Sequence, residues 1–434
     1  MSKPEQRIEG LRRLLTQLHS RVQLAFGFRL WDGTTIPANW PSTGLMIAIA
    51  DEGAVAGLTR APKVTTLANL WAAKRIDIVN GTIFDLVALR PKGRTRDIRK
   101  SLGKLQAIKT AFDFLFVPRG GPWPLEAIGK DAESDGSAGE NKKNIAYHYD
   151  VSNAFYELWL DKEMVYTCAY YHDWSDDLDT TQSQKLDMVC RKLRLKPGET
   201  VLDMGCGWGA FSCYAAQNYG VKAYGVTLSE QQVAYANDKI KRLGLANSVT
   251  IELKDYALVE GDARFDKVAA IGMLEHVGID NFPTYFKTVH RLLKPGGLFL
   301  HHAITRPGKS HQARGGRKRA EFQALTRYIF PGGELDYIGR TVTNLEVNGF
   351  EIHDVEGWRE HYQRTCRVWH DRLLANYDAA CAEVGEVNTR IWLVYLAACS
   401  ISFERNNVGL YQTLSSKRVK GSVGLPPTRA DLYR

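Results

Sequence analysis

Short apolar runs alternate with segments of helical spacing along the middle of the chain. Runs of strand length occur at 200–204, 222–228, 249–253, 265–271 and 298–303, and helical periodicity occurs at 209–219, 229–243 and 281–293. Strands and helices joined by short links in this order predict a parallel, doubly wound, Rossmann-like α/β sheet. A helical region is expected before it at 144–195, and residues 310–420 are expected to add helices and end in a polar tail.

The first third of the chain has a different pattern. Apolar residues at 8, 11, 14, 15, 18, 22 and 25 have helical spacing, and residues 44–90 alternate short apolar runs with turn signals. This pattern predicts a small mixed α+β domain over 1–130. The polar, glycine- and serine-rich stretch 131–143 is typical of a flexible linker, which leaves 144–434 as a second domain.

Charge adds a second distinction between the two domains. The 434 residues carry a net charge of +9, whereas residues 1–130 alone hold 20 Lys+Arg and 10 Asp+Glu, a net of +10. A basic domain favours an anionic partner such as a membrane surface, nucleic acid or an acidic protein, although the charge is equally compatible with a solubility device. Basic segments at 91–100 and 314–319 are candidate contacts, and the second is also compatible with a solvated loop.

The cellular compartment is predicted from three features that the sequence lacks. No run of about 18 apolar residues predicts a membrane span, and the first residues do not read as a secretory signal. The seven cysteines lack paired spacing, so we expect reduced thiols and no zinc site. These observations predict a cytoplasmic protein.

A glycine-rich turn follows the strand predicted at 200–204. Gly205, Gly207 and Gly209 remove side chains where backbone must approach a ligand, and Asp203 lies at the strand end. The spacing is tighter than a dinucleotide fingerprint, which favours a ligand without pyrophosphate, such as S-adenosylmethionine (SAM). The next strand ends at Thr227, where hydroxyl and amide side chains replace the acid that many SAM enzymes place at the ribose.

From about residue 144 to 420 the chain closely resembles the cyclopropane-fatty-acyl-phospholipid synthases and the related mycolic acid cyclopropane synthases. The segments that carry the resemblance are 145–156, 164–171, 201–209, 225–229, 273–278 and 406–412. The basic first domain resembles the family's amino-terminal lipid-handling domain more weakly. The resemblance implies a SAM-dependent methyltransferase domain with SAM contacts at Tyr166, Thr167, Asp203, Gly205, Cys206, Gly207, Gly209, Thr227, Leu228, Gln232, Tyr256 and Ala257. For Tyr256, a half-buried position at a strand end is the structural alternative.

The resemblance also implies a bound bicarbonate that acts as the base. The matching positions are His148, Cys168, Glu275, His302, Ile304 through its backbone, and Tyr362. Cys399 matches a family cysteine near the site, although a packed core thiol fits it better. Cys168 as a covalent nucleophile is disfavoured, because the reaction needs no acyl or alkyl enzyme. His301 and His302 should point to opposite faces of a strand, so we expect no metal.

Cyclopropanation requires a dry site, because an alkene attacks the sulfonium methyl and forms a carbocation that water would quench. Aromatic rings can stabilise this cation, and the candidates are Tyr147, Tyr149, Tyr170, Tyr171 and Phe330, each of which has core packing as the alternative role. The expected activity is methylene addition to a cis double bond of a phospholipid acyl chain, by a peripheral enzyme at the cytosolic face of the membrane. The resemblance suggests a homodimer.

Three alternatives remain open at this point. A fatty-acyl C-methyltransferase would share the first step and lose a different proton. A nucleic-acid methyltransferase could use the basic domain, but the Asp/Asn-Pro-Pro-aromatic motif and any nucleic-acid signature in 1–130 are lacking, so no nucleic-acid partner is expected. A non-catalytic lipid-binding protein is disfavoured by the filled catalytic positions.

Overall fold

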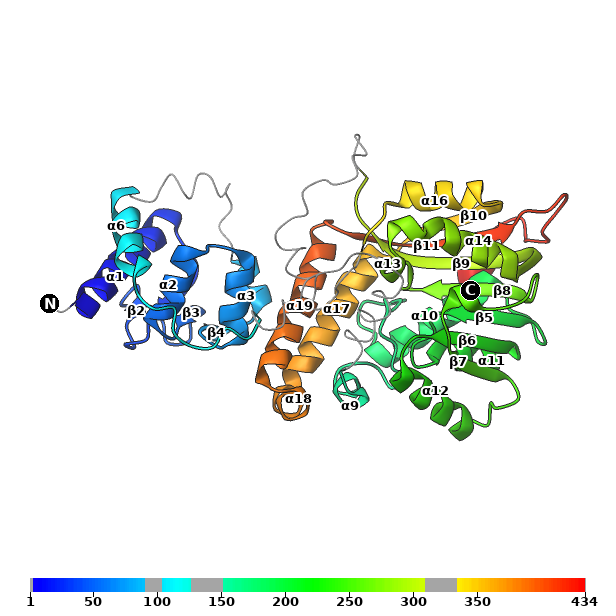
Figure 1. Ribbon diagram of the computed structural model, residues 1–434, viewed down its shortest axis with the longest axis horizontal. Coiled ribbons are helices and arrows are strands. Elements are labelled where there is room, and N and C mark those ends of the chain that lie inside the picture. The colour runs from blue at the N-terminus through cyan, green and yellow to red at the C-terminus, as the bar shows by residue number, and fades with distance from the viewer. Residues whose placement is uncertain (1–2, 90–103, 126–150, 309–333, 434) are drawn as a thin grey trace. The chain divides into compact units, whose positions relative to one another are not determined.

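The computed structural model describes residues 3–89, 104–125, 151–308 and 334–433 (Figure 1). The chain forms two compact units. Among the described residues, the first unit contains those up to Leu125 together with Gly385–Ala397, and the second contains the rest. The predicted linker 131–143 and the basic segments 91–100 and 314–319 lie outside the described residues.

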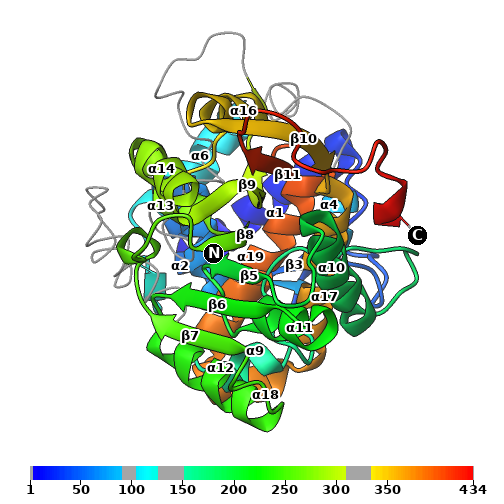
Figure 2. The same cartoon turned by 90° about the vertical axis from the view of Figure 1, so that its right-hand side faces the viewer.

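The second unit is built on a seven-stranded sheet with the order β10-β11-β9-β8-β5-β6-β7 (Figure 2). The strands are β5 (Thr200–Met204), β6 (Lys222–Thr227), β7 (Val249–Leu253), β8 (Phe265–Ile271), β9 (Leu293–Thr305), β10 (Phe350–Gly357) and β11 (Gly409–Lys417). Strands β5 to β9 pair in parallel, which confirms the predicted doubly wound sheet.

Residues 310–420 were expected to add helices, and the structure places the strands β10 and β11 there as well. They pair antiparallel with each other, and β11 pairs antiparallel with β9. The apolar pattern misses β11 because Gln412, Thr413, Ser415 and Ser416 are buried in it. Their burial is possible because partners far away in sequence bind them: for example, Ser415 Oγ donates to the Phe299 carbonyl at 3.4 Å.

Alternating side chains of the sheet pack into two separate hydrophobic cores. Val201 and Ile251 pack with α10 (Leu178–Leu193), α11 (Ala210–Tyr219) and α12 (Glu230–Arg242). Leu202 and Met204 pack on the other face with α14 (Phe282–Leu292) and α16 (Ile338–Val347). The strand period of two thus places neighbouring residues in different chemical surroundings.

The helical region expected at 144–195 is shorter than predicted. Among the described residues it contains α9 (Asn153–Glu157) and α10, with an irregular segment between them. Asp161 explains the irregularity, because its carboxylate accepts hydrogen bonds from the amides of Glu163 and Val165, both at 2.9 Å. Met164 adopts a positive φ of 59° within this turn. A buried side chain that binds backbone amides competes with helix formation.

Three consecutive helices belong to the described carboxyl-terminal part. They are α17 (Arg359–Ala375), α18 (Tyr377–Val384) and α19 (Glu386–Glu404), and short turns are α13 (Leu274–Val277), η1 (Tyr256–Leu258), η2 (Ile279–Asn281) and η3 (Ala430–Tyr433). In the parts of the chain that the structure describes, no helix is long and apolar enough to cross a membrane.

The first unit has the mixed α+β character predicted from its pattern. Its sheet has the order β2-β1-β3-β4, with only β1 and β3 parallel. The elements are α1 (Lys3–Val22), β1 (Gly27–Arg29), β2 (Thr35–Ile36), β3 (Met46–Ile49), α2 (Glu52–Arg60), α3 (Val64–Ala72), β4 (Ile76–Val79), α4 (Ile83–Ala88) and α6 (Lys104–Leu115). Leu11, Phe28 and Phe114 belong to its core.

Candidate active site

The glycine turn joins β5 to α11 and leaves open space at one position. Gly205, Gly207 and Gly209 have positive φ values of 75°, 55° and 79°. A Cβ on Gly209 would lie 2.7 Å from the Ile251 Cδ1 atom, so this glycine is required by packing. A Cβ on Gly207 would meet nothing within 4 Å. The turn is therefore fixed on its protein side and open at Gly207, which suits the close approach of a ligand.

Asp203 lies at the end of β5 but faces the protein interior. Its side chain is buried, and Oδ2 accepts a hydrogen bond from Ser212 Oγ at 2.8 Å. Burial raises the pKa of this carboxyl to about 6, and the nearby Lys185 partly opposes that rise. The contact that the structure records for Asp203 thus fixes the start of α11 against β5. Cys206 follows in the turn and is buried.

The ends of β6 and β7 lie beside the turn, because parallel register aligns Met204 with Val226 and Thr227 with Leu253. Thr227 Oγ1 donates to Gln232 Oε1 at 2.6 Å, and both side chains are buried. Leu228 follows directly. After β7, Asp255 Oδ1 accepts from the Ala257 amide at 2.9 Å and shapes η1. Three neighbouring strands therefore end at one edge of the sheet, as the sequence predicts.

Tyr256, the first residue of η1, is partly buried with its ring edge-on to Tyr285 at 5.7 Å. Burial raises the pKa of its phenol. Tyr166 lies in an aromatic group, with ring centroids 5.3 Å from Trp159 and 5.2 Å from Trp369. These rings offer flat apolar surfaces of the kind that bind an adenine or a sulfonium.

Lys185 is a buried residue that the sequence reading missed. It belongs to α10, is 1% exposed, and its Nζ donates to Thr167 Oγ1 at 2.8 Å. Burial lowers its pKa to about 8, although Asp161, Cys168 and Asp203 favour the charged form. The signal in the sequence was a lysine on the helix face that also carries Leu178 and Leu186, since apolar residues normally occupy such a face.

Glu275 follows β8 and is 2% exposed. Its Oε1 accepts the Ile304 amide at 2.6 Å, so the backbone group predicted to hold a ligand holds this carboxyl instead. Its Oε2 is buried and has no hydrogen-bond partner among the described residues. Burial raises the pKa of Glu275 to about 7, with the Ile304 bond opposing the rise. The carboxyl is thus poised between its two protonation states near neutral pH.

His302 lies on β9 and is connected to a buried lysine through Gln412. Lys192 Nζ, which can only donate, binds Gln412 Oε1 at 2.8 Å. The amide nitrogen of Gln412 therefore faces His302 Nδ1 at 3.1 Å and donates to it. Burial first, and then Lys185 and Lys192, lower the pKa of His302 well below its ordinary value. We conclude that His302 is neutral with its proton on Nε2, and Nε2 has no partner among the residues described.

Cys168 and Tyr362 complete the predicted group. Cys168 is fully buried, and its Sγ donates to the Ala169 carbonyl at 3.1 Å. Burial raises the pKa of this thiol well above its usual value, which disfavours the nucleophile alternative. Burial also raises the pKa of the Tyr362 phenol, and Tyr166, Cys168 and Glu275 add to that rise. Tyr166, Cys168 and Glu275 therefore each lie within electrostatic range of Tyr362.

The remaining predicted residues divide into those near the site and those outside the described part. Cys399 is half-buried on α19 and contributes to the raised pKa of Cys366, which is in turn influenced by Cys168. Tyr170 stacks on His361 with centroids 4.6 Å apart, and Tyr171 stacks more loosely on the same ring. The predicted positions that lie outside the described residues are His148, Tyr147, Tyr149 and Phe330.

His301 and His302 face opposite sides of the sheet, as strand geometry predicts. His301 Nδ1 lies 3.1 Å from the Tyr285 hydroxyl, and its ring lies near Phe286 and Phe299. In the described ranges, no three His, Cys, Asp or Glu side chains are arranged to hold a metal ion.

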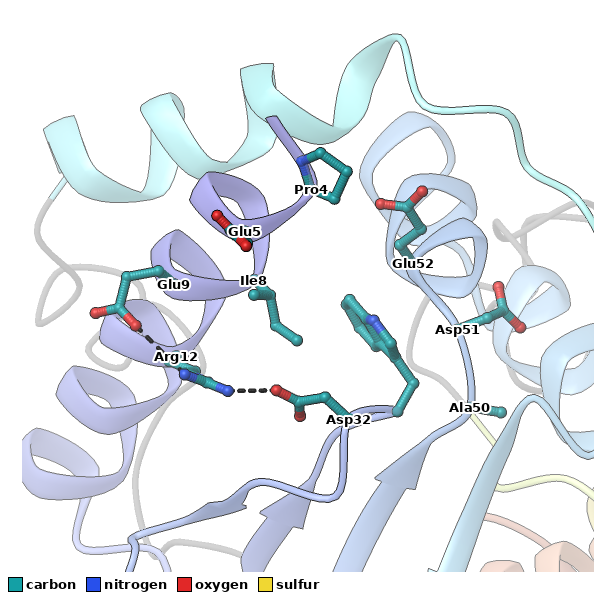
Figure 3. Close-up of a pocket in the computed structure, with 10 residues that line it drawn as sticks. Pro4, Glu5, Ile8, Glu9, Arg12, Asp32, Ala50, Asp51 and Glu52 are labelled. Carbon is teal, nitrogen blue, oxygen red and sulfur yellow. Dashed lines mark hydrogen bonds and ion pairs between the residues drawn. The ribbon is translucent and has the colours of Figure 1, made fainter. Parts of the chain in front are cut away.

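A pocket of about 650 Å³ in the first unit is lined by residues of α1 and α2 and by Trp31 and Asp32 (Figure 3). Its acidic residues bind arginines: Arg12 pairs with Asp32, and Arg7 pairs with Glu52 at 2.8 Å. Asp51 binds Arg75 with both carboxylate oxygens. These ion pairs place an arginine against Asp32, Asp51 and Glu52, three of the acidic residues that line the pocket.

Comparison with known proteins identifies relatives of both the second unit and the whole chain. The model of the family described as mycolic acid cyclopropane synthetase matches residues 137–413. A probable fatty acid methyltransferase from Pseudomonas putida is 36% identical over 426 residues, which cover 97% of this chain and 100% of the relative. The cyclopropane-fatty-acyl-phospholipid synthase of Escherichia coli K12 is 36% identical over 279 residues, or 64% of this chain and 68% of the relative.

The solved structure of mycolic acid cyclopropane synthase CmaA1 complexed with SAH and CTAB is similar in fold. It superimposes with a TM-score of 0.60 and 31% sequence identity, over 64% of this chain and 98% of that protein.

Proposed function

The chain belongs to the mycolic acid cyclopropane synthetase family of SAM-dependent methyltransferases, and we propose that it adds a methylene from SAM across a cis double bond of an unsaturated phospholipid acyl chain. The observation that carries this proposal is the pair of buried polar atoms without partners in the described chain, Glu275 Oε2 and His302 Nε2. A buried acceptor and a buried donor of this kind suit a small polar ligand that bonds to both.

The turn after β5 fits SAM. The open side of Gly207 admits a ligand close to the backbone, and the Thr227–Gln232 pair places polar atoms at the neighbouring strand end. Tyr256 supplies an aromatic surface beside them, and Lys185 holds the Thr167 hydroxyl. When bound, SAM supplies an electrophilic methyl group. The residues of this edge orient that methyl group, and their burial keeps water from it.

Glu275 and His302 fit bicarbonate, which would supply a base for the proton that leaves the transferred methyl group. The Nε2–H of neutral His302 can donate to an oxyanion, and ionised Glu275 can accept an O–H and orient it. Cys168 and Tyr362 provide neutral donors within the same electrostatic neighbourhood, because burial keeps both protonated.

Aromatic rings in the second unit could stabilise a carbocation on the acyl chain. Tyr166 lies among Tyr156, Trp159 and Trp369, and Tyr170 lies 4.6 Å from Trp358. Such rings attract a cation electrostatically without reacting with it. Tyr170 was among the residues predicted for this role. Tyr166 and its aromatic neighbours are additional candidates for it.

A second candidate function is C-methylation that leaves a methyl branch or a methylene group. It is favoured by the relative that aligns with 97% of this chain, a probable fatty acid methyltransferase. Both reactions begin with attack of the alkene on the methyl group and release of the sulfide. In cyclopropanation the proton leaves the new methyl group and the ring closes. In C-methylation a neighbouring chain carbon can lose the proton, which leaves a methyl-branched alkene. Alternatively, a hydride shifts from the methylated carbon to the cation and the methyl group then loses the proton, which leaves a methylene group.

The deciding experiment is incubation of the protein with SAM and vesicles of monounsaturated phospholipid, followed by mass spectrometry and proton NMR of the lipid. A product that is one CH2 heavier, with high-field ring protons and no alkene, supports cyclopropanation. The same mass with an alkene retained identifies C-methylation. No change in the lipid would contradict both candidates for this substrate class.

Access to such a substrate requires the protein to reach a bilayer. We propose peripheral association with the cytosolic face of the membrane, since the net charge of +10 over residues 1–130 suits anionic headgroups. A homodimer is proposed from the family resemblance alone.

A further inference from the structure

Helix α6 of the first unit is apolar on two opposite faces. Thr110, Phe114 and Val117 are buried, and this side of the helix lies against α1 and α2. The other side carries four large apolar side chains, three on the helix and one directly after its end, of which 66%, 63%, 40% and 75% are exposed: Ile108, Phe112, Leu115 and Phe116. We call these four residues the α6 ridge.

The ridge is continuous along the helix. Its members are four, three and one residues apart, which places them on one side at about 100° per residue. The rings of Phe112 and Phe116 touch edge to face with centroids 5.5 Å apart. The core of the first unit needs only the opposite face, so packing within the described unit does not account for the ridge. Contiguous exposed apolar surface of this kind marks a site of interaction.

The charges around the ridge are basic. Lys109 and Arg119 are exposed, and the Arg119 guanidinium lies 4.5 Å from the Trp123 ring centroid. Arg60 donates to the Leu115 carbonyl at 2.8 Å at the end of the helix. The helix's own acid, Asp113, is half-buried on the side of α1, close to Gly10. The ridge is thus bordered by cations, and the acid of the helix points away.

We propose that the α6 ridge inserts into the boundary between headgroups and acyl chains of an anionic phospholipid membrane. Phenylalanine and aliphatic side chains flanked by Lys and Arg are the composition of helices that lie in this interface. The net charge of +10 over residues 1–130 supplies the complementary electrostatic attraction. The proposal rests on the proposed function, because that function places the substrate in a bilayer.

The test is co-sedimentation of the full chain with vesicles of monounsaturated phosphatidylglycerol and phosphatidylethanolamine. We expect Phe112→Ser/Phe116→Ser to lower the partition coefficient by roughly tenfold or more, because burial of one phenylalanine side chain changes a partition by about that factor. Phe112→Leu/Phe116→Leu should retain most of the binding. The matched control is Leu67→Ser/Val347→Ser, which removes two exposed apolar side chains outside the ridge and should bind like the parent.

Two results would overturn the proposal: equal vesicle binding by the serine variant and the parent, or a parent dimer that the serine variant converts to a monomer without loss of vesicle binding. The second would make the ridge a contact between copies of the chain. Circular dichroism checks that the variant is folded. Product formation from a monomeric short-chain unsaturated phospholipid separates the two proposals. If the parent forms no product from this substrate, the proposed function is contradicted, and vesicle binding still decides the role of the ridge.

Discussion

At the scale of single residues, burial sets the protonation states in the candidate site. It keeps Cys168 and Tyr362 neutral, makes His302 neutral, and brings the Glu275 carboxyl to a pKa of about 7. A site of neutral donors around one titrating acid suits a reaction that forms a cation, because no strong nucleophile faces it.

Replacement of Glu275 by glutamine should reduce turnover and raise stability at neutral pH. We expect kcat to fall by about 10²- to 10⁴-fold, the usual contribution of a positioned acid–base group, with SAM affinity nearly unchanged. The folded pKa of about 7 exceeds the ordinary value of 4.5 for a glutamate, so the parent loses stability as pH rises from 4.5 to 7. Glu275→Gln should lack this loss.

Denaturant unfolding at pH 5 and pH 8 measures this difference, with isothermal titration calorimetry for SAM binding. Glu346→Gln, at an exposed position of α16, is the control. Parallel pH profiles for Glu275→Gln and the parent, or unchanged turnover, would contradict the assignment.

Gln412→Glu should reverse the tautomer of His302. A carboxylate at position 412 can only accept from Nδ1, so the imidazole proton moves to Nδ1 and Nε2 can no longer donate. We expect turnover to fall at least about tenfold with little change in the KM for SAM, as for other changes in the partner that orients an active imidazole. Histidine ¹³C and ¹⁵N NMR reports the tautomer directly.

Ser415→Ala on the same strand is the matched control, because it removes a hydrogen bond to the Phe299 carbonyl and leaves His302 untouched. A His302 with Nε2 still protonated in Gln412→Glu would disprove the positioning role.

At the scale of elements, the helices and strands that could be predicted are those with a clear apolar pattern. Strands β5 to β8 and helices α11, α12 and α14 agree closely with the predicted segments, because their core faces are apolar. Strand β9 is longer than predicted, since it begins at Leu293 and not at Leu298. In β10 only Phe350 and Asp354 are buried, so its apolar pattern is weak. Strand β11 escapes prediction because four of its buried residues are polar and depend on partners such as His302, 110 residues from Gln412. Lys185 escapes for the same reason, since its partner Thr167 lies in an irregular segment.

Through Lys185, the α10 helix binds that irregular segment close to the candidate SAM site. We expect Lys185→Met to weaken SAM binding by roughly tenfold, because it removes a charged hydrogen bond to Thr167 and keeps the volume. Calorimetric titration with SAM tests this. Lys267 lies near the amino-terminal end of β8, away from the carboxyl ends of the strands. Lys267→Met should therefore leave SAM affinity unchanged. Equal affinities for all three proteins would exclude the role.

At the scale of the whole molecule, the excess charge and the candidate chemistry lie in different units. The pattern of the sequence predicts a basic first domain over residues 1–130, and the family resemblance suggests the roles of Glu275, His302 and Cys168, which stay predictions. The α6 ridge could not be predicted in that way, because an apolar helix face looks the same in sequence whether the core buries it or solvent meets it.

Salt should therefore act on substrate access and not on the reaction. Product formation on anionic vesicles should fall steeply between 0.05 and 0.5 M NaCl, because the Debye length shortens from more than 10 Å to less than 8 Å and surface cations lose their attraction. A monomeric substrate should show little salt dependence. Equal salt profiles for the two substrates would remove the electrostatic docking argument.

Five of the seven cysteines are buried, and in the interior their thiols are held in the unreactive protonated form: Cys168, Cys190, Cys206, Cys213 and Cys366. They belong to different elements, so each can be modified only when its own surroundings open. The rate at which each thiol is modified, measured by mass spectrometry, would then report how often the structure around that cysteine opens. Binding of SAM should slow the modification of Cys168 and Cys206 beside the candidate site more than that of Cys190, and the protein would report occupancy of its own site without a turnover assay.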